Sequence, residues 1–107
     1  MKMILAVVSG DDSNAVSTAL TKGGFQVTKL ATTGGFLMSG NTTFLIGVDD
    51  DKVDDAISVI AHHSRKRKQI VPDNSFSEVG MYSALPIEVT VGGATVFVMN
   101  VERFEKV

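Results

Sequence analysis

The sequence contains no cysteine or tryptophan, one tyrosine, two prolines and little net charge. Without cysteine, the chain has no disulfide framework, no thiolate nucleophile and no thiolate metal site. The net charge of −2 gives no argument for a nucleic acid polymer or an acidic membrane surface as partner. No apolar run reaches the length that crosses a bilayer, and residues 3–8 are too short for the core of a signal peptide. We therefore expect a soluble, cytoplasmic protein.

What is present is the composition of one globular domain. The 107 residues are 44% hydrophobic and 21% charged, which is typical of a folded chain rather than a disordered one. The length favours a single domain that spans residues 1–107.

The first half of the chain shows strand and helix patterns in alternation. Residues 3–9 are apolar on both faces, which predicts a central strand. Asp11, Asp12 or Ser13 could cap a following helix, which Gly23-Gly24 would end. The predicted apolar stripe of this helix is Val16, Ala19 and Leu20.

Two strands are predicted next, over residues 25–32 and about 41–48. Alternation places Gln26, Thr28, Leu30 and Thr32 on one face of the first strand, and Asn41, Thr43, Leu45 and Gly47 on one face of the second. If the two strands pair, Gln26 and Thr28 share a sheet face with Asn41 and Gly47. Gly47 leaves room there for a flat group to approach the backbone.

The second half begins with the clearest helical stripe of the sequence. Residues 49–51, three aspartates, open this helix, and its apolar positions are Val53, Ala56, Ile57, Ile60 and Ala61. Residues 69–71 could form a short strand, and residues 72–85 show no periodicity. Residues 87–91 and 94–101 read as strands that Gly92-Gly93 joins as a two-residue hairpin turn.

The resulting order, β-α-β-β-α-β, predicts an α+β fold, a ferredoxin-like sandwich with an added C-terminal hairpin strand. Two helices would cover one sheet face. Because the first and last strands carry apolar residues on both sides, the other face also needs cover, and no predicted element remains to supply it. We therefore expect an oligomer whose subunits pack sheet against sheet.

The stretch 29–44 lies between the second and third predicted strands. It holds two threonine pairs, glycines, Asn41 and the apolar Phe36 and Leu37. Free backbone amides, hydroxyls, a carboxamide and an aromatic ring are groups that a nucleotide pocket uses. A polar hairpin whose hydrophobic tip packs on a neighbour explains the same composition, so both interpretations stand on composition alone.

No arrangement of residues predicts catalysis or a metal site. His62 and His63 are adjacent on a helix and point about 100° apart, so they cannot chelate one ion together. The basic run 65–68 is short and lacks interleaved aromatics, which favours a solvated turn. The aspartates 49–51 lack the spacing of a calcium loop. We expect a protein that is not an enzyme and holds no metal or cofactor.

Four segments carry a resemblance that extends over almost the whole chain. They are Met1-Lys-Met-Ile, Lys29-Leu-Ala-Thr-Thr-Gly-Gly-Phe-Leu, Gly40-Asn-Thr-Thr-Phe and Val91-Gly-Gly-Ala-Thr-Val-Phe-Val. With these segments the sequence resembles the PII-like cyclic di-AMP receptors of the PstA/DarA type. The resemblance implies a PII-like homotrimer that binds cyclic di-AMP between subunits and relays the signal to a protein partner. It also implies a receptor rather than an enzyme.

The resemblance further implies which residues touch the ligand. One adenine would lie against the second and third strands, loop residues would wall the ligand, and an aromatic of the last strand would contact it. The matching positions are Gln26, Thr28, Gly35, Phe36, Leu37, Asn41, Gly47 and Phe97.

The sequence departs from the family pattern at several positions. Gln26 stands where the family commonly has Arg, and Met38 where it has a basic residue; Gly24 and Lys106 replace Asn and Gln. Glutamine cannot replace the charged, planar contacts of arginine. An alternative is therefore a PII-like trimer that has lost this ligand and acts as an interaction module or binds a mononucleotide such as ATP or AMP. A metal-binding trimer is the weaker third hypothesis.

Overall fold

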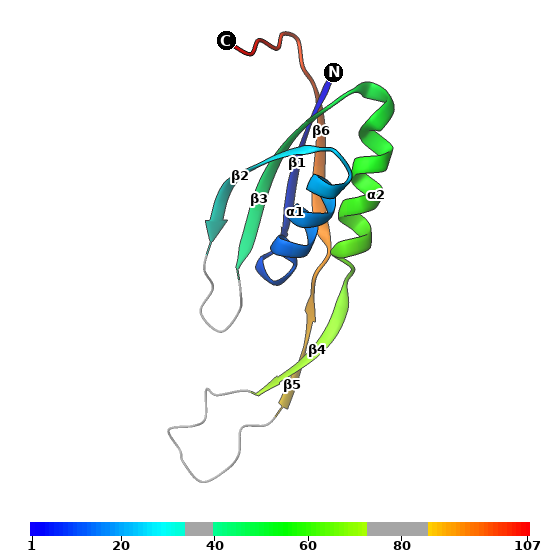
Figure 1. Ribbon diagram of the computed structural model, residues 1–107. Coiled ribbons are helices and arrows are strands. Elements are labelled where there is room, and N and C mark those ends of the chain that lie inside the picture. The colour runs from blue at the N-terminus through cyan, green and yellow to red at the C-terminus, as the bar shows by residue number, and fades with distance from the viewer. Residues whose placement is uncertain (34–39, 73–85) are drawn as a thin grey trace.

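The computed structural model describes residues 1–33, 40–72 and 86–107 of the chain. In these residues, two helices cover one face of a four-stranded antiparallel sheet, and a separate two-stranded ribbon extends from the body (Figure 1). The elements are β1 (Lys2–Ser9), η1 (Gly10–Asp12), α1 (Ser13–Lys22), β2 (Gln26–Thr33), β3 (Asn41–Val48), η2 (Asp50–Lys52), α2 (Val53–His63), β4 (Arg67–Pro72), β5 (Pro86–Val91) and β6 (Ala94–Asn100); η1 and η2 are 3₁₀ turns.

The main sheet has the strand order β2-β3-β1-β6, and each neighbouring pair is antiparallel. The α+β class with two helices on one sheet face is confirmed and is consistent with the ferredoxin-like fold. Strand β1 pairs with β3 on one side and β6 on the other, so its predicted central position is also confirmed. The helices cover the apolar residues on one face of β1, whereas no described element covers those on its other face.

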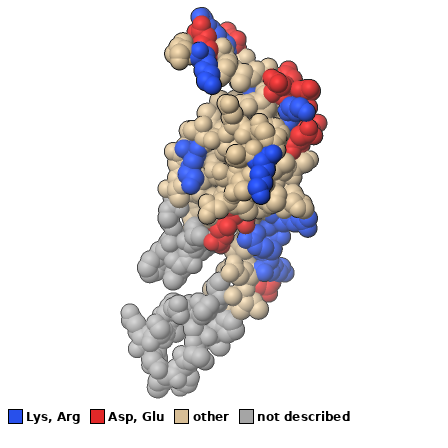
Figure 2. All heavy atoms as spheres, viewed as in Figure 1, with Lys and Arg blue, Asp and Glu red and all other residues tan. Residues whose placement is uncertain are grey.

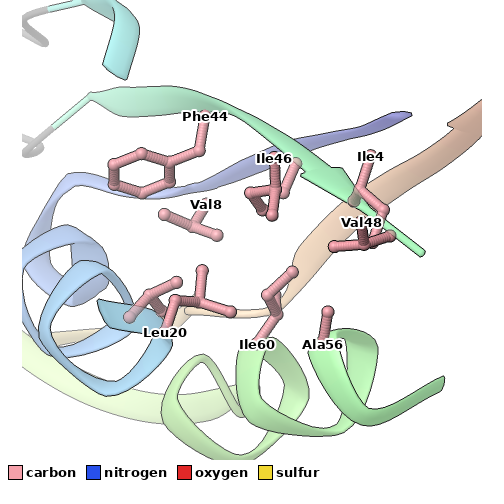
Figure 3. Close-up of a cluster of buried hydrophobic side chains, with 10 residues drawn as sticks. Ile4, Val8, Leu20, Phe44, Ile46, Val48, Ala56 and Ile60 are labelled. Carbon is pink, nitrogen blue, oxygen red and sulfur yellow. The ribbon is translucent and has the colours of Figure 1, made fainter. Parts of the chain in front are cut away.

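The hydrophobic core lies between the sheet and the two helices. In Figure 3 the side chains of β1 and β3 point toward those of α1 and α2. Alternate residues of both strands are buried, while Val16 and Leu20 of α1 and Ala56 and Ile60 of α2 have no exposed surface. Ala61 of α2 is exposed, although the apolar stripe predicted for this helix included it. The core residues are Ile4, Ala6, Val8, Val16, Leu20, Phe44, Ile46, Val48, Ala56 and Ile60.

The predicted alternation along β2 is wrong beyond Lys29. Lys29 pairs with Phe44 and Ala31 with Thr43, so Leu30 is an extra residue in β2. Such a β-bulge reverses which residues face which side. Thr32 consequently opposes the buried Thr42 and does not share the face of Gln26 and Thr28.

The predicted hairpin between β5 and β6 is also wrong. β5 pairs with β4 in the ribbon, whereas β6 pairs with β1 along its length. Gly92 and Gly93 have φ values of 84° and 81°, and they direct the chain from the ribbon into the main sheet. The Gly93 amide donates to the Ser64 carbonyl, which joins this turn to the end of α2. Pairing with the central strand outweighs the local hairpin signal, and β6 becomes the fourth strand of the sheet.

The aspartates before the helices do not cap them with their side chains. The chain enters α1 through η1 and α2 through η2, and neither α-helix has a side-chain cap hydrogen bond at its first turn. Asp12 occupies the N-cap position of α1, but its carboxylate is engaged elsewhere. The Ser13 hydroxyl instead donates to the Gly10 carbonyl at 3.0 Å and closes η1.

The chain is elongated. Its radius of gyration is 17.5 Å, with principal extents of 61 × 25 × 21 Å. A compact domain of this length has a radius of gyration of about 13 Å. The ribbon of β4 and β5, which pair with each other and not with the main sheet, accounts for part of this extension (Figure 1).

The turn at Gly92 yields a test of the fold. Alanine at Gly92 would place its Cβ against the Arg65 carbonyl at a positive φ. Alanine at Gly24, also at positive φ (88°), would meet nothing within 4 Å. We expect Gly24→Ala to cost about 1–2 kcal/mol of backbone strain and Gly92→Ala to cost clearly more, as measured by urea unfolding. Equal losses would contradict the described approach of the two backbone segments.

Candidate functional site

The sheet face opposite the helices is the candidate site. No described element covers this face, although it presents apolar side chains from β1, β3 and β6. Phe97 is 53% and Met99 37% exposed, and Met3, Leu5 and Val7 are half-buried. An exposed apolar face of this kind marks a binding surface for a ligand or another chain.

Gln26 and Gly47 lie directly opposite each other on β2 and β3. Both line a hollow of about 570 Å³ at the end of the sheet where β2 begins and β3 ends. Thr28 opposes Leu45, one pair further along the same face. The full lining is Met1, Gly23, Gly24, Phe25, Gln26, Gly47, Val48, Asp49, Lys52, Asp55 and Val59.

Gly47 keeps part of this hollow open. A Cβ at this position would meet only the terminal Cε of Met1, at 3.0 Å. That methyl ends a flexible side chain, so it can move aside. The space beside Gly47 therefore follows from its missing side chain, as the sequence predicted.

At the rim of the hollow, the positively charged groups lie beside carboxylates. Asp49 and Asp55 line it, and Lys52, the one lysine or arginine in the lining, lies 4.0 Å from the Asp55 carboxylate. Nearby, the hydrogen bond from the Met1 ammonium at 2.8 Å lowers the pKa of Asp50, against the opposing effect of desolvation. This rim suits an uncharged ring or a hydrogen-bonding edge better than a phosphate.

Asn41 shares this face but lies at the other end of β3. It pairs with Ser9 of β1 and Thr33 of β2. Gly47 comes six positions after Asn41, which is about 20 Å along a strand. The shared face is confirmed, while the two residues are too far apart to contact one base.

Phe97 lies at the opposite edge of the sheet from Thr28. The register places Thr28, Leu45, Leu5 and Phe97 in one row across β2, β3, β1 and β6. Three strand spacings separate the two ends of the row by about 14 Å. The structure thus brings Gln26, Thr28 and Gly47 together, but not Phe97.

The remaining predicted residues, Gly35, Phe36 and Leu37, lie outside the described residues, as does Met38. Sequence reasoning missed the wall of the hollow formed by Phe25 and the start of α2. From the sequence, the aspartates 49–51 were interpreted only as the start of a helix. Their closeness to Gln26 depends on how α2 packs on the sheet, for which the sequence carries no local signal.

The other candidate groups lie away from this site. The rings of His62 and His63 make a T-shaped contact at 4.8 Å between centroids. The part of the chain that the structure describes contains neither a cluster of three or more metal-ligating side chains nor a helix long and apolar enough to span a membrane. The basic residues 65–68 lie where the ribbon leaves the body, and Figure 2 shows basic side chains gathered there beside a smaller acidic patch.

Two comparisons with known proteins match the chain over nearly its whole length. A solved structure described as "a functionally unknown protein from Pediococcus pentosaceus ATCC 25745" is similar at 38% identity and a TM-score of 0.75, over 99% of this chain and 96% of that one. A family model described as "Cyclic-di-AMP receptor" matches residues 1–107, the whole chain. The chain therefore belongs to the cyclic di-AMP receptor family.

Proposed function

We propose that this protein is a signal-transduction protein that binds cyclic di-AMP at the subunit interfaces of a homotrimer. In this proposal it is a cytoplasmic receptor without enzymatic activity. Binding is relayed to a protein partner by loop rearrangement. The loops proposed for this, 33–40 and 72–85, lie almost entirely outside the described residues. One observation carries the proposal. Gln26 and Gly47 lie toward one edge of a single uncovered apolar face, and Phe97 lies at the opposite edge. The chain that presents this face belongs to the cyclic di-AMP receptor family.

The separation of these residues supports a site between subunits. A ligand that touches Thr28 and Phe97 of one chain would have to extend over Leu5 and Leu45. If subunits pack sheet against sheet, Phe97 of a neighbouring chain can reach the hollow beside Gln26 instead. The same packing would bury the apolar open face, which an isolated chain leaves in water.

The spacing along β3 favours a ligand with two bases. About 20 Å separates Gly47 from Asn41, so a mononucleotide cannot fill both ends of this surface. The rim near Gln26 and Gly47 is suited to an adenine edge or ring, and Phe97 offers a stacking surface. Stacking on an aromatic is worth about 1–3 kcal/mol per base in nucleic-acid systems.

Gln26 motivates the alternative function. The side chain is exposed at the hollow and brings no positive charge there. A trimer that has lost cyclic di-AMP and acts as an interaction module, or binds ATP or AMP, would share the same fold. Titration with cyclic di-AMP, ATP and AMP separates the two functions.

The first prediction concerns the ligand itself. Isothermal titration with cyclic di-AMP should saturate near one ligand per chain, whereas cyclic di-GMP and ATP should not compete. Gln26→Arg should raise the affinity about tenfold or more, because a charge-assisted hydrogen bond contributes roughly 1.5–3 kcal/mol. Absence of heat with cyclic di-AMP, together with heat from ATP or AMP, would support the alternative.

The second prediction uses the space beside Gly47. Gly47→Ala should change the free energy of unfolding by less than about 1 kcal/mol, because its methyl meets only the end of Met1. The same methyl should weaken cyclic di-AMP binding about tenfold or more, a loss of roughly 1.4 kcal/mol.

Gly23→Ala is the matched control for this prediction. It adds a methyl elsewhere on the lining, 3.2 Å from the Phe25 ring, and should weaken binding less. Unchanged affinity in Gly47→Ala would place the ligand away from this hollow.

The third prediction tests whether two subunits complete each site. Gly47→Trp blocks the hollow, and Phe97→Ala removes the ring from the opposite edge. Refolded alone, each variant should bind weakly at a limiting concentration of cyclic di-AMP. Refolded together in equal amounts, they should recover about a quarter of the sites, because random assembly leaves that share with both faces intact. No recovery on mixing would show that one chain supplies the whole site.

A further inference from the structure

A bidentate ion pair outside the candidate site joins η1 to the ribbon. Arg67 donates from Nη2 to Asp12 Oδ1 at 2.8 Å and from Nη1 to Asp12 Oδ2 at 3.2 Å. The Asp12 side chain is only 9% exposed, whereas that of Arg67 is 44% exposed. Bidentate pairs of this type fix orientation as well as distance. The hydrogen bond that Arg67 donates to Asp12 also raises the pKa of Arg67.

Asp12 is available for this contact because it does not cap α1. It occupies the N-cap position, where an aspartate usually accepts hydrogen bonds from the first helical amides. Here it makes no such bond, and both carboxylate oxygens bind Arg67. The local sequence predicts a cap, so the use of Asp12 as a tertiary partner is a feature of the folded chain.

Arg67 fixes the base of the ribbon. It is the first residue of β4 and pairs with Val91, the last residue of β5. Its Nη1 also donates to the Arg65 carbonyl at 3.1 Å, against which Gly92 packs. Both strands of the ribbon therefore leave the body beside this one guanidinium. A two-stranded ribbon is marginally stable in water, so its direction depends strongly on the contacts at its base.

The other end of η1 is tied to the candidate binding face. The Gly10 amide donates to the Gly40 carbonyl at 2.8 Å. Gly40 immediately precedes Asn41, and Asn41 pairs with Ser9, the residue before Gly10. The Ser13 hydroxyl closes the turn on the Gly10 carbonyl. A single short turn thus connects the start of β3 with the Asp12 carboxylate.

We propose that the Asp12–Arg67 pair couples ligand binding at the Asn41 end of β3 to the orientation of the β4–β5 ribbon. This inference rests on the proposed function, because it takes cyclic di-AMP as the ligand. A displacement at Gly40 and Asn41 moves η1 through the Gly10 hydrogen bond, and the two parallel hydrogen bonds of Asp12 turn Arg67 with it. Both side chains are positioning residues and do not contact the ligand.

Because the coupling is reciprocal, it can be measured at the ligand site or at the ribbon. If the ligand favours one orientation of the ribbon, then loosening the ribbon changes the affinity for the ligand by the same factor. Coupling between two sites typically corresponds to a factor of about 5–150. Two explanations compete with this coupling: a purely structural salt bridge, and no coupling at all. They predict different changes in the hydrogen exchange of the ribbon when the ligand binds.

The test combines hydrogen exchange of ribbon amides with titration of cyclic di-AMP. Wild-type protein is compared with Asp12→Asn, which keeps the shape of the side chain and removes its charge. Lys68→Gln is the matched control, because it removes the exposed Lys68–Glu88 ion pair (3.2 Å) one residue away on the same strand. Exchange is followed at residues 68–71 and 87–91, with and without saturating cyclic di-AMP.

We expect cyclic di-AMP to change exchange in the wild-type ribbon several-fold and Asp12→Asn to abolish this change, while affinity shifts about fivefold or more. Lys68→Gln should behave as wild type. If wild-type protein binds cyclic di-AMP but hydrogen exchange in its ribbon does not change, the coupling is overturned and the proposed function is not. If cyclic di-AMP still changes ribbon exchange in Asp12→Asn, the pair is only a structural salt bridge and the proposed coupling is overturned. No binding to wild type would reject both the proposed function and this inference.

A second variant covers the case in which Asp12→Asn does not fold. Arg67→Lys leaves the Asp12 carboxylate with a cation but removes the bidentate geometry. It should keep the fold and reduce the ligand response of the ribbon to less than that of wild type. Where Asp12→Asn does fold, the double variant Asp12→Asn/Arg67→Lys should match the more severe single variant, because both changes break the same link. Additive losses would overturn the assignment to this pair.

Discussion

Burial of one sheet face beneath α1 and α2 is the constraint on which the rest of the structure depends. The core between them draws alternate residues of β1 and β3 inward (Figure 3). With a side-chain period of two, the intervening residues must point to the opposite face. Because several of these are also apolar, the packing that stabilises the fold creates the uncovered face on which the proposed ligand site and trimer contacts lie.

Strand order decides how the residues on that face can cooperate. Gln26 and Gly47 meet because β2 and β3 are neighbours, and they meet in register at the end of the sheet. Phe97 is on β6, which pairs on the far side of β1. The candidate residues are thus divided between two edges of one sheet. This division is the reason that a site shared between chains explains them better than a pocket within one chain.

The ribbon shows how a small number of polar contacts can control a large segment. β4 and β5 pair with each other and not with the main sheet. Their base is held by the hydrogen bonds of Arg67 and by the glycine turn that follows β5. The same η1 turn carries Asp12 and donates from the Gly10 amide to the Gly40 carbonyl just before β3. The fold therefore provides a short mechanical connection between the binding face and the ribbon.

The sequence by itself determined the elements whose signals are local. Its periodicity predicted α2, the central position of β1, and the shared face of Gln26, Thr28, Asn41 and Gly47, because side-chain direction repeats every 3.6 or 2 residues. Long-range competition decided the rest. The bulge at Leu30, the pairing of β5 with β4, and the use of Asp12 by Arg67 each depend on partners distant in sequence. Tertiary structure alone therefore separated Phe97 from Thr28 and joined η1 to the ribbon.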